Sequence, residues 1–342
     1  MTAQTLMYRE IREIPDAIRR LLNEGREGIE VAADDLRRSA PHFISTVARG
    51  SSDHAATYFK YAAELTLGLP VASIGPSIAS IYGTELQLGH SACIAISQSG
   101  QSPDIVEMTQ SAAKQGALTV AITNETSSPL AQACKHNIPI HAGTERSVAA
   151  TKTFVTSAVA GLALLAHWKQ DKPLIAAIDQ LPEHLENAVT YDWPTLRHAL
   201  DDRESLFVLG RGPSYAMSNE AALKFKETCQ IHAESYSSAE VLHGPVSIVE
   251  PGYPVLVLAS RDASEGSIVS VADKLSQQGA VTFISSDHAQ HAERLGFAKT
   301  SHPLTDPLSL IVSFYAFIER LAGERGINPD LPRNLKKVTE TV

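Results

Sequence analysis

Short apolar runs alternate with longer amphipathic stretches along most of this 342-residue chain. The runs cover 43–48, 92–96 and 118–122 in the first half, and 205–209, 255–259 and 281–285 in the second. Each run has the length of a buried parallel strand, and each is followed by a polar turn and a helical pattern. This alternation predicts an α/β fold in which each half is a three-layer, doubly wound parallel sheet with helices on both faces.

The two halves resemble each other where their first strands end. Val47-Ala-Arg-Gly-Ser-Ser52 closes the first strand of one half, and Leu209-Gly-Arg-Gly-Pro-Ser214 follows at an offset of 162 residues. Both turns lead into helical patterns, over 54–65 and 215–228. An internal duplication is the economical explanation; the alternative is coincidence, because such turns are common in α/β proteins.

The duplication suggests a division of the chain into five parts. We expect an N-terminal helical segment (1–30), a first domain (31–170), a helical linker (171–193), a second domain (194–330) and a C-terminal tail (331–342).

Composition narrows the class of protein. Apolar residues make up 44% and charged residues 20%, enough for an ordinary core in each half. The net charge of −9, without a cluster of Lys or Arg, argues against a nucleic-acid partner. The N-terminus carries charges throughout and lacks the apolar core of a signal peptide, and no apolar run is long enough to span a bilayer. We therefore expect a soluble protein without a membrane partner.

The three cysteines, Cys93, Cys134 and Cys229, are widely spaced and form no CxxC pair. This argues against a disulfide framework and a thiolate metal site, and favours reduced thiols in the cytoplasm. Histidines at 141, 232 and 243 fit no zinc spacing, so we expect neither metal nor cofactor.

One loop is suited to an anion. Ser97-Gln-Ser-Gly-Gln-Ser-Pro-Asp104 follows a predicted strand and precedes a predicted helix over 105–115. Its hydroxyls and amide are donors, Gly100 permits close backbone approach, and a helix N-terminus attracts negative charge. The alternative is a Ser-rich turn with a helix cap. Gly50-Ser51-Ser52 could form a second wall of the same pocket.

Other polar segments are ambiguous from spacing alone. Lys224 and Glu227 are three residues apart on one helix face, where Glu could act as a base and Lys could stabilise charge. Glu220 and Lys224 equally fit an ordinary surface salt bridge. Lys152, at the start of a helix, is either a phosphate ligand or a solvated side chain. His243 lies in a turn, and histidine is a residue type often used for acid–base chemistry near neutral pH.

Together these segments resemble the sugar isomerase (SIS) family. The similarity is strongest to the isomerase half of glucosamine-6-phosphate synthase and to stand-alone deaminases of that type. The motifs that carry it occur in the family's order along nearly the whole chain: Gly50-Ser-Ser52, Ser97-Gln-Ser-Gly100, Ala149-Ala-Thr-Lys-Thr-Phe154, Leu223-Lys-Phe-Lys-Glu227, His232-Ala-Glu234, Glu240-Val-Leu-His-Gly-Pro245 and Pro332-Arg-Asn-Leu335. The resemblance implies two tandem SIS domains of flavodoxin-like topology.

The resemblance also implies a role for individual residues. The positions that match contacts to the phosphate and the sugar hydroxyls are Ser51, Ser52, Ser97, Gln98, Ser99 and Ser102, and Val148 matches a backbone contact to the sugar. Glu227 matches the base that moves a proton between C1 and C2, and Lys224 its charged neighbour. His243 matches a ring-opening residue donated by the other subunit of a homodimer. Lys337 matches a tail lysine near the reacting carbon, although Lys336 stands beside it.

The implied substrate is a hexose 6-phosphate or an amino-sugar phosphate. The chain begins with Met1-Thr2 and leads directly into the isomerase region, so we expect no hydrolysis of glutamine. These features predict a glucosamine-6-phosphate deaminase that releases ammonia and fructose 6-phosphate. The alternatives are a fructosamine-6-phosphate deglycase, another aldose–ketose phosphosugar isomerase, and a sugar-phosphate-sensing module without catalysis.

Overall fold

The computed structural model describes residues 4–337 and contains two compact units. The β1–β5 unit comprises residues 13–145, 152–179 and 336–337. The β6–β10 unit comprises residues 4–12, 146–151 and 180–335. Each unit is therefore assembled from separate stretches of chain, and each has its own parallel sheet.

The β1–β5 unit contains the apolar runs predicted in the first half. Its strands are β1 (Phe43–Val47), β2 (Val71–Ser73), β3 (Ser91–Ile96), β4 (Leu118–Thr123) and β5 (His136–Pro139). Its helices are α2 (Ile14–Glu24), α3 (Arg26–Ser39), α4 (Ser51–Leu67), α5 (Ser77–Ser80), α6 (Pro103–Lys114), α7 (Pro129–Ala133), α8 (Lys152–Lys169) and α9 (Lys172–Asp179). All strand pairs are parallel, in the order β2-β1-β3-β4-β5.

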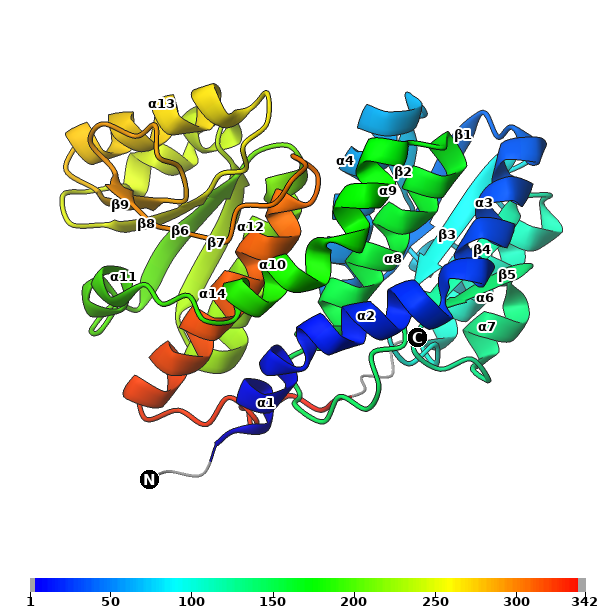
Figure 1. Cartoon of the computed structure of the whole chain (residues 1–342), viewed down its shortest axis with the longest axis horizontal. Coiled ribbons are helices and arrows are strands. Elements are labelled where there is room, and N and C mark those ends of the chain that lie inside the picture. Colours follow the sequence, from blue (N-terminus) through cyan, green and yellow to red (C-terminus); the bar gives the residue numbers. More distant parts are fainter. Residues whose placement is uncertain (1–3, 338–342) are drawn as a thin grey trace. The chain divides into compact units, whose positions relative to one another are not determined.

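Helices cover both faces of this sheet, as the alternation of strands and helices requires. On one face α8 packs between α3 and α4, and on the other α6 packs between α5 and α7 (Figure 1). Every residue of β3 is buried, which explains its continuous apolar sequence. Helix α8 is buried along nearly its whole length, so its sequence is apolar on all sides instead of amphipathic.

The β6–β10 unit repeats the plan. Its strands are β6 (Ser205–Gly210), β7 (His232–Ser237), β8 (Pro254–Leu258), β9 (Val281–Ile284) and β10 (Glu293–Arg294). Its helices are α1 (Leu6–Arg12), α10 (Leu181–Ala188), α11 (Pro194–Ala199), α12 (Pro213–Cys229), α13 (Glu265–Gln277) and α14 (Asp306–Glu324), with 3₁₀ turns η1 (Glu240–His243) and η2 (Pro245–Ile248). Helix α12 packs on β6, β7 and α14, and α13 on the opposite face (Figure 1).

The two sheets share one topology. When the strands of each unit are counted in chain order, both sheets run 2-1-3-4-5, the flavodoxin-like order. The pair Val47 and Ala95 recurs as Leu209 and Val257, so the offset of 162 residues holds on both central strands. The turn glycines also match: Gly50 has φ 56° and ψ −136°, and Gly212 has φ 56° and ψ −135°. The predicted tandem αβα fold is confirmed, and the matching geometry supports duplication.

All six predicted strands are present, with ends within one residue of those expected. The sequence pattern missed four strands, β2, β5, β7 and β10, which are the edge strands of the two sheets. β2 and β10 are very short, and β5 and β7 carry polar side chains. Neither an alternation of apolar and polar residues nor a continuous apolar run therefore identifies these strands.

Gly210 lies at the end of β6, where α12 packs closely. A Cβ there would lie 2.5 Å from the Ser214 carbonyl oxygen and 2.6 Å from the Tyr215 Cα. Gly210→Ala should therefore destabilise the protein by about 1–3 kcal/mol through overpacking. Urea unfolding at constant m-value measures the change.

Gly266, in helix α13, provides the matched control because a Cβ there has nothing within 4 Å. Gly266→Ala should stabilise the protein by about 0.4–1 kcal/mol, since alanine restricts the unfolded chain. Equal stability of the two variants would contradict the close contact at Gly210.

Candidate functional site

Strands β1 and β3 mark the point where the strand order of the first sheet reverses. Ligands of open α/β sheets bind beyond the carboxyl ends of the strands at such a switch point. Ser51 and Ser52 follow β1 and form the first turn of α4, so they belong to the helix and not to the preceding turn. Ser97, Gln98, Ser99 and Ser102 follow β3. Because β1 and β3 are parallel neighbours, both sets lie at the same edge of the sheet.

The loop after β3 is held by its own hydrogen bonds. The backbone N–H of Gly100 donates to Ser97 Oγ at 3.2 Å, and that of Gln101 donates to Ser99 Oγ at 3.3 Å. Gly100 has φ 61°, and a Cβ there would lie 2.1 Å from Ser128 Oγ. Only glycine fits this position. Ser97 is buried, whereas Gln98, Ser99 and Ser102 are partly accessible to a ligand.

Two helices begin at this edge. The N-termini of α4 and α6 add partial positive charge, which favours an anion. An ion pair lies at the same edge: Arg49 binds Asp104 Oδ2 through Nε at 2.7 Å and Nη2 at 2.6 Å. The sequence analysis did not identify this pair, since its members are 55 residues apart.

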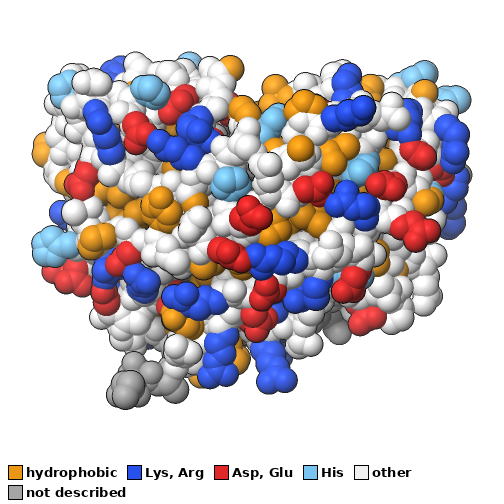
Figure 2. Space-filling model, in the orientation of Figure 1, with side chains coloured by type: hydrophobic (Ala, Val, Ile, Leu, Met, Phe, Trp, Pro, Cys, Tyr) orange, Lys and Arg blue, Asp and Glu red, His pale blue; other side chains and the backbone are white. Residues whose placement is uncertain are grey.

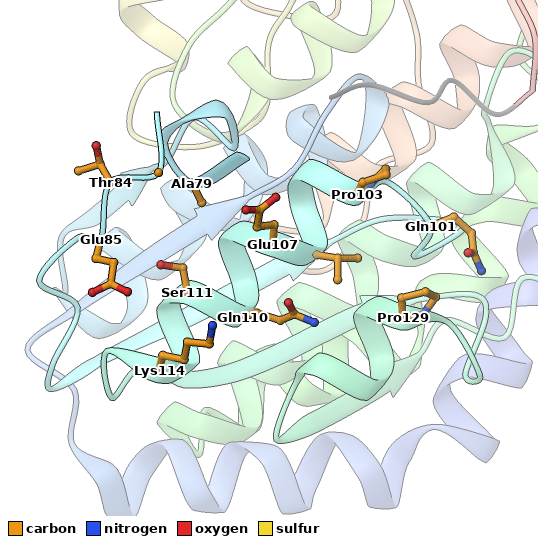
Figure 3. Close-up of a pocket in the computed structure, with 12 residues that line it drawn as sticks. Ala79, Thr84, Glu85, Gln101, Pro103, Glu107, Gln110, Ser111, Lys114 and Pro129 are labelled. Carbon is orange, nitrogen blue, oxygen red and sulfur yellow. The ribbon is translucent and has the colours of Figure 1, made fainter. Parts of the chain in front are cut away.

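A groove of about 540 Å³ runs along the outer side of α6. Figure 3 shows Glu107, Gln110, Ser111 and Lys114 of that helix lining it, with Gln101 at the loop. Its lining contains none of the predicted phosphate-binding residues. The groove is therefore separate from the predicted loop contacts.

In the β6–β10 unit, helix α12 carries a buried charged cluster. Lys224 Nζ lies 2.7 Å from Glu227 Oε2 and 3.0 Å from Glu220 Oε1. Tyr315, on the adjacent helix α14, donates to Glu220 Oε1 at 2.9 Å. Lys224 and Glu220 are fully buried and the Glu227 side chain is 18% exposed. An ordinary surface salt bridge, the alternative reading of Glu220 and Lys224, is therefore wrong.

The cluster keeps its lysine charged. Burial alone lowers the pKa of Lys224, but the carboxylates of Glu220 and Glu227 outweigh burial and hold that pKa well above its ordinary value. Glu227 is the member with solvent access, so it is the carboxylate of this cluster that a ligand can reach. The arrangement suits proton transfer by a carboxylate beside a fixed cation.

His243 ends the 3₁₀ turn η1 and is exposed. Within residues 4–337 no hydrogen bond or ion pair joins it to Lys224 or Glu227. Leu242 and Ile248, on the same pair of turns, are 38% and 57% exposed. The structure thus places His243 on an exposed and partly apolar surface of its own unit.

Val148 lies in the segment that precedes helix α8. The backbone N–H groups of Arg146 and Ser147 donate to the buried carboxylate of Glu10, with distances of 3.2–3.3 Å for Ser147. Glu10 thereby holds the backbone immediately before Val148 in place. The sequence analysis missed Glu10, because it is 136 residues from Arg146, whose backbone N–H donates to it.

The tail lysine has a defined partner. Lys337 Nζ lies 2.8 Å from Oε2 of Glu145, whose side chain is fully buried, whereas Lys336 is exposed. Thr153 also donates to Glu145, through its backbone N–H at 3.1 Å and its hydroxyl at 2.6 Å. Of the two adjacent lysines, Lys337 is therefore the one turned toward the unit that contains Glu145.

Lys152 is neither solvated nor placed as a free phosphate ligand. Its side chain is 1% exposed, and Nζ donates to Glu13 Oε2 at 2.5 Å and to the Thr144 carbonyl at 3.1 Å. The expectation of a solvated Lys152 is therefore wrong, because the pairing with Glu13, 139 residues away, is not visible in the local sequence.

Residues 4–337 contain no group of three or more His, Cys, Asp and Glu side chains arranged to hold a metal ion. In the same range, no helix combines the length and apolarity needed to cross a membrane. On the face shown in Figure 2, basic and acidic side chains are interspersed, as is usual for a solvated surface.

Comparison with known proteins identifies one domain family and a set of related enzymes. The SIS domain family model matches residues 39–167 and 199–290. A glutamine–fructose-6-phosphate aminotransferase (isomerizing) of Methanothermobacter thermautotrophicus is 31% identical over 341 residues. That alignment covers 97% of this chain and 56% of the relative. The chain thus spans little more than half the length of the curated relatives it matches.

Two solved structures are informative. A candidate phosphosugar isomerase from Silicibacter pomeroyi has a TM-score of 0.94 at 59% identity, covering 96% of this chain and all of that one. Glucosamine-6-phosphate deaminase from Thermotoga maritima has a TM-score of 0.73 at 18% identity, covering 93% of this chain and all of that one. The latter likeness shows the fold alone.

The Glu145–Lys337 pair should hold the tail in place. Glu145→Gln removes the anion, which should cost about 1 kcal/mol and raise the open population of the tail about fivefold. Trypsin cleavage at Lys336 and Lys337, followed by mass spectrometry, should accelerate accordingly. Glu13→Gln is the matched control, because Glu13 pairs with Lys152 and not with the tail. Equal cleavage of both variants would contradict tail docking through Glu145.

The same pair predicts a dependence on pH. Burial alone raises the pKa of Glu145, but Lys337 and Thr153 outweigh burial, so that pKa lies below its ordinary value of 4.5. Its contribution to stability is therefore complete above pH 4.5 and is lost as pH falls through the lower folded-state pKa. The difference in unfolding free energy between the unmodified protein and Glu145→Gln should be constant near neutral pH and shrink in acid. A difference that grows on acidification would contradict this sign.

Proposed function

Because the chain belongs to the SIS domain family, we propose that it is a glucosamine-6-phosphate deaminase that works by aldose–ketose isomerisation. Glucosamine 6-phosphate and water are converted to fructose 6-phosphate and ammonia. The observation that carries this proposal is the cluster on α12, where buried Lys224 holds a cation against the partly exposed carboxylate of Glu227. A carboxylate beside a fixed cation suits a proton shift between adjacent carbons.

The first part of the proposal concerns the phosphate. The donors assigned to phosphate and sugar hydroxyls are Ser51, Ser52, Ser97, Gln98, Ser99 and Ser102. Their position at the carboxyl ends of β1 and β3, next to two helix N-termini, supports that assignment. Val148 contributes a backbone contact to the sugar, and its segment is preorganised by Glu10.

The second part concerns the reaction. His243 assists opening of the sugar ring, and Glu227 then takes the proton from C2 and returns it to C1. Lys224 stabilises negative charge that develops on the enol oxygen or nitrogen. The product is a ketose imine at C2, which water attacks to release ammonia and leave the ketone of fructose 6-phosphate. Lys337, which pairs with Glu145, is assigned the part of the tail lysine that acts at the reacting carbon.

The third part concerns the assembly and compartment. A homodimer, in which His243 serves the site of the partner subunit, agrees with the exposure of His243 beside Leu242 and Ile248. A cytoplasmic location agrees with three free cysteines. Burial raises the pKa of Cys93 to about 11, so this thiol stays neutral and inert. The two SIS domains are proposed to extend over residues 31–170 and 194–330.

The proposal is tested with purified protein, glucosamine 6-phosphate and a chelator, in the absence of glutamine. Ammonia and fructose 6-phosphate should appear in equal amounts. Glu227→Gln should lower kcat about 10²- to 10⁴-fold, the usual contribution of a positioned acid–base group, while fructose 6-phosphate binding persists. Glu250→Gln, an exposed glutamate of the same unit, is the matched control and should retain activity.

Other outcomes separate the alternatives. Full turnover by Glu227→Gln would refute the assigned base. Binding without products would direct the test to fructose-amine 6-phosphates, the substrates of a deglycase, and to aldose–ketose conversion without ammonia release. If none of these compounds reacts although fructose 6-phosphate binds, the chain is a sugar-phosphate sensor.

A further inference from the structure

Arg49 and Asp104 link the two segments that form the proposed phosphate site. Arg49 stands between β1 and the start of α4 at Ser51 and Ser52, and Asp104 lies in the first turn of α6, two residues after Ser102. Both Nε and Nη2 of Arg49 reach the same oxygen of Asp104, at 2.7 and 2.6 Å. The pair therefore lies directly beside the donors assigned to phosphate.

Asp104 is an unusual neighbour for an anion site. Its side chain is fully buried, so water does not screen its charge. Its other oxygen accepts the backbone N–H of Ile105 at 2.8 Å, which uses one of the free donors of the helix N-terminus. Without a compensating cation, this carboxylate would repel a phosphate bound at the start of α6.

We propose that Arg49 is a positioning residue for phosphate binding, which acts by cancelling the charge of Asp104. This inference rests on the proposed function, because it takes the Ser97–Ser102 loop as the phosphate site. Arg49 does not have to touch the ligand: its effect passes through Asp104, and the neutral pair leaves the helix dipoles and hydroxyl donors free to attract the anion.

The second half of the chain offers an internal comparison. At the offset of 162 residues, Arg49 corresponds to Arg211, but Asp104 corresponds to Gly266. Glycine has no side chain, so the equivalent ion pair cannot form in the β6–β10 unit. The unit whose switch point carries the serine-rich loop is thus also the unit that carries both members of the pair.

A purely mechanical role is the main alternative. The contact between Arg49 and Asp104 could simply brace the β1–α4 turn against α6, or Arg49 could bind the phosphate directly. Under either alternative, removal of Asp104 in addition to Arg49 would not help. If cancellation of charge is what matters, neutralising Asp104 makes Arg49 dispensable.

The experiment is a double-mutant comparison by calorimetric titration with fructose 6-phosphate and with inorganic phosphate. Arg49→Met should weaken binding of both about tenfold or more, as expected for one uncompensated charge near an anion. The double variant Arg49→Met/Asp104→Asn should recover most of the lost affinity, and Arg49→Lys should retain most of it. In turnover assays, KM of Arg49→Met should rise while kcat changes little. Arg19→Met, which removes a guanidinium from an exposed pair with Asp16 in the same unit, is the control.

The outcomes are distinguishable. Failure of the unmodified protein to bind fructose 6-phosphate overturns the proposed phosphate site and this inference with it. If the unmodified protein binds and Arg49→Met binds equally well, only the role of Arg49 is refuted. A double variant as weak as Arg49→Met refutes cancellation of charge and assigns Arg49 to bracing or direct contact. Thermal unfolding of each variant identifies any that has failed to fold. If Arg49→Met is one of these, the affinity of Arg49→Lys decides whether a cation at position 49 is sufficient for binding.

Discussion

The strand order 2-1-3-4-5, shared by both sheets, is the constraint on which the rest of the structure depends. In such a sheet the chain leaves the first and third strands in opposite directions, so the loops after them diverge and leave room for a ligand. In the first sheet those loops carry the serine-rich segments and two helix N-termini. In the second, the same geometry positions α12 against β6 and α14, which buries one face of that helix and makes a cluster of Glu220, Lys224 and Glu227 possible.

Much of this fold was predictable from local pattern. Central strands such as β3 and β8 are buried on both faces, so their sequences are uninterrupted apolar runs that mark them clearly. Edge strands such as β7, His232–Ser237, have only partial burial and carry polar residues, which removes that signal. Whether a strand lies at the edge depends on how the whole sheet is assembled, so a short stretch of sequence does not reveal it.

The candidate site was predictable only in part, and for the same reason. The spacing of Lys224 and Glu227 shows that they share a helix face, but not that Lys224 is fully buried, since that depends on the packing of α14 with Tyr315. Arg49 with Asp104, Glu10 with Ser147, and Glu145 with Lys337 all join segments far apart in the chain. For each of these three buried carboxylates, the residues next to it in the sequence do not show which distant group it pairs with.

The way the chain divides between the two units limits how the duplication can be taken apart. Residues 146–151 lie within the first half of the sequence but belong to the β6–β10 unit, and residues 336–337 belong to the β1–β5 unit. A cut in the polar stretch between the halves would therefore leave each unit incomplete, because a segment of each unit would remain on the other fragment. Although the fold has the form of two copies, the boundary between the two units therefore does not coincide with any single point in the chain.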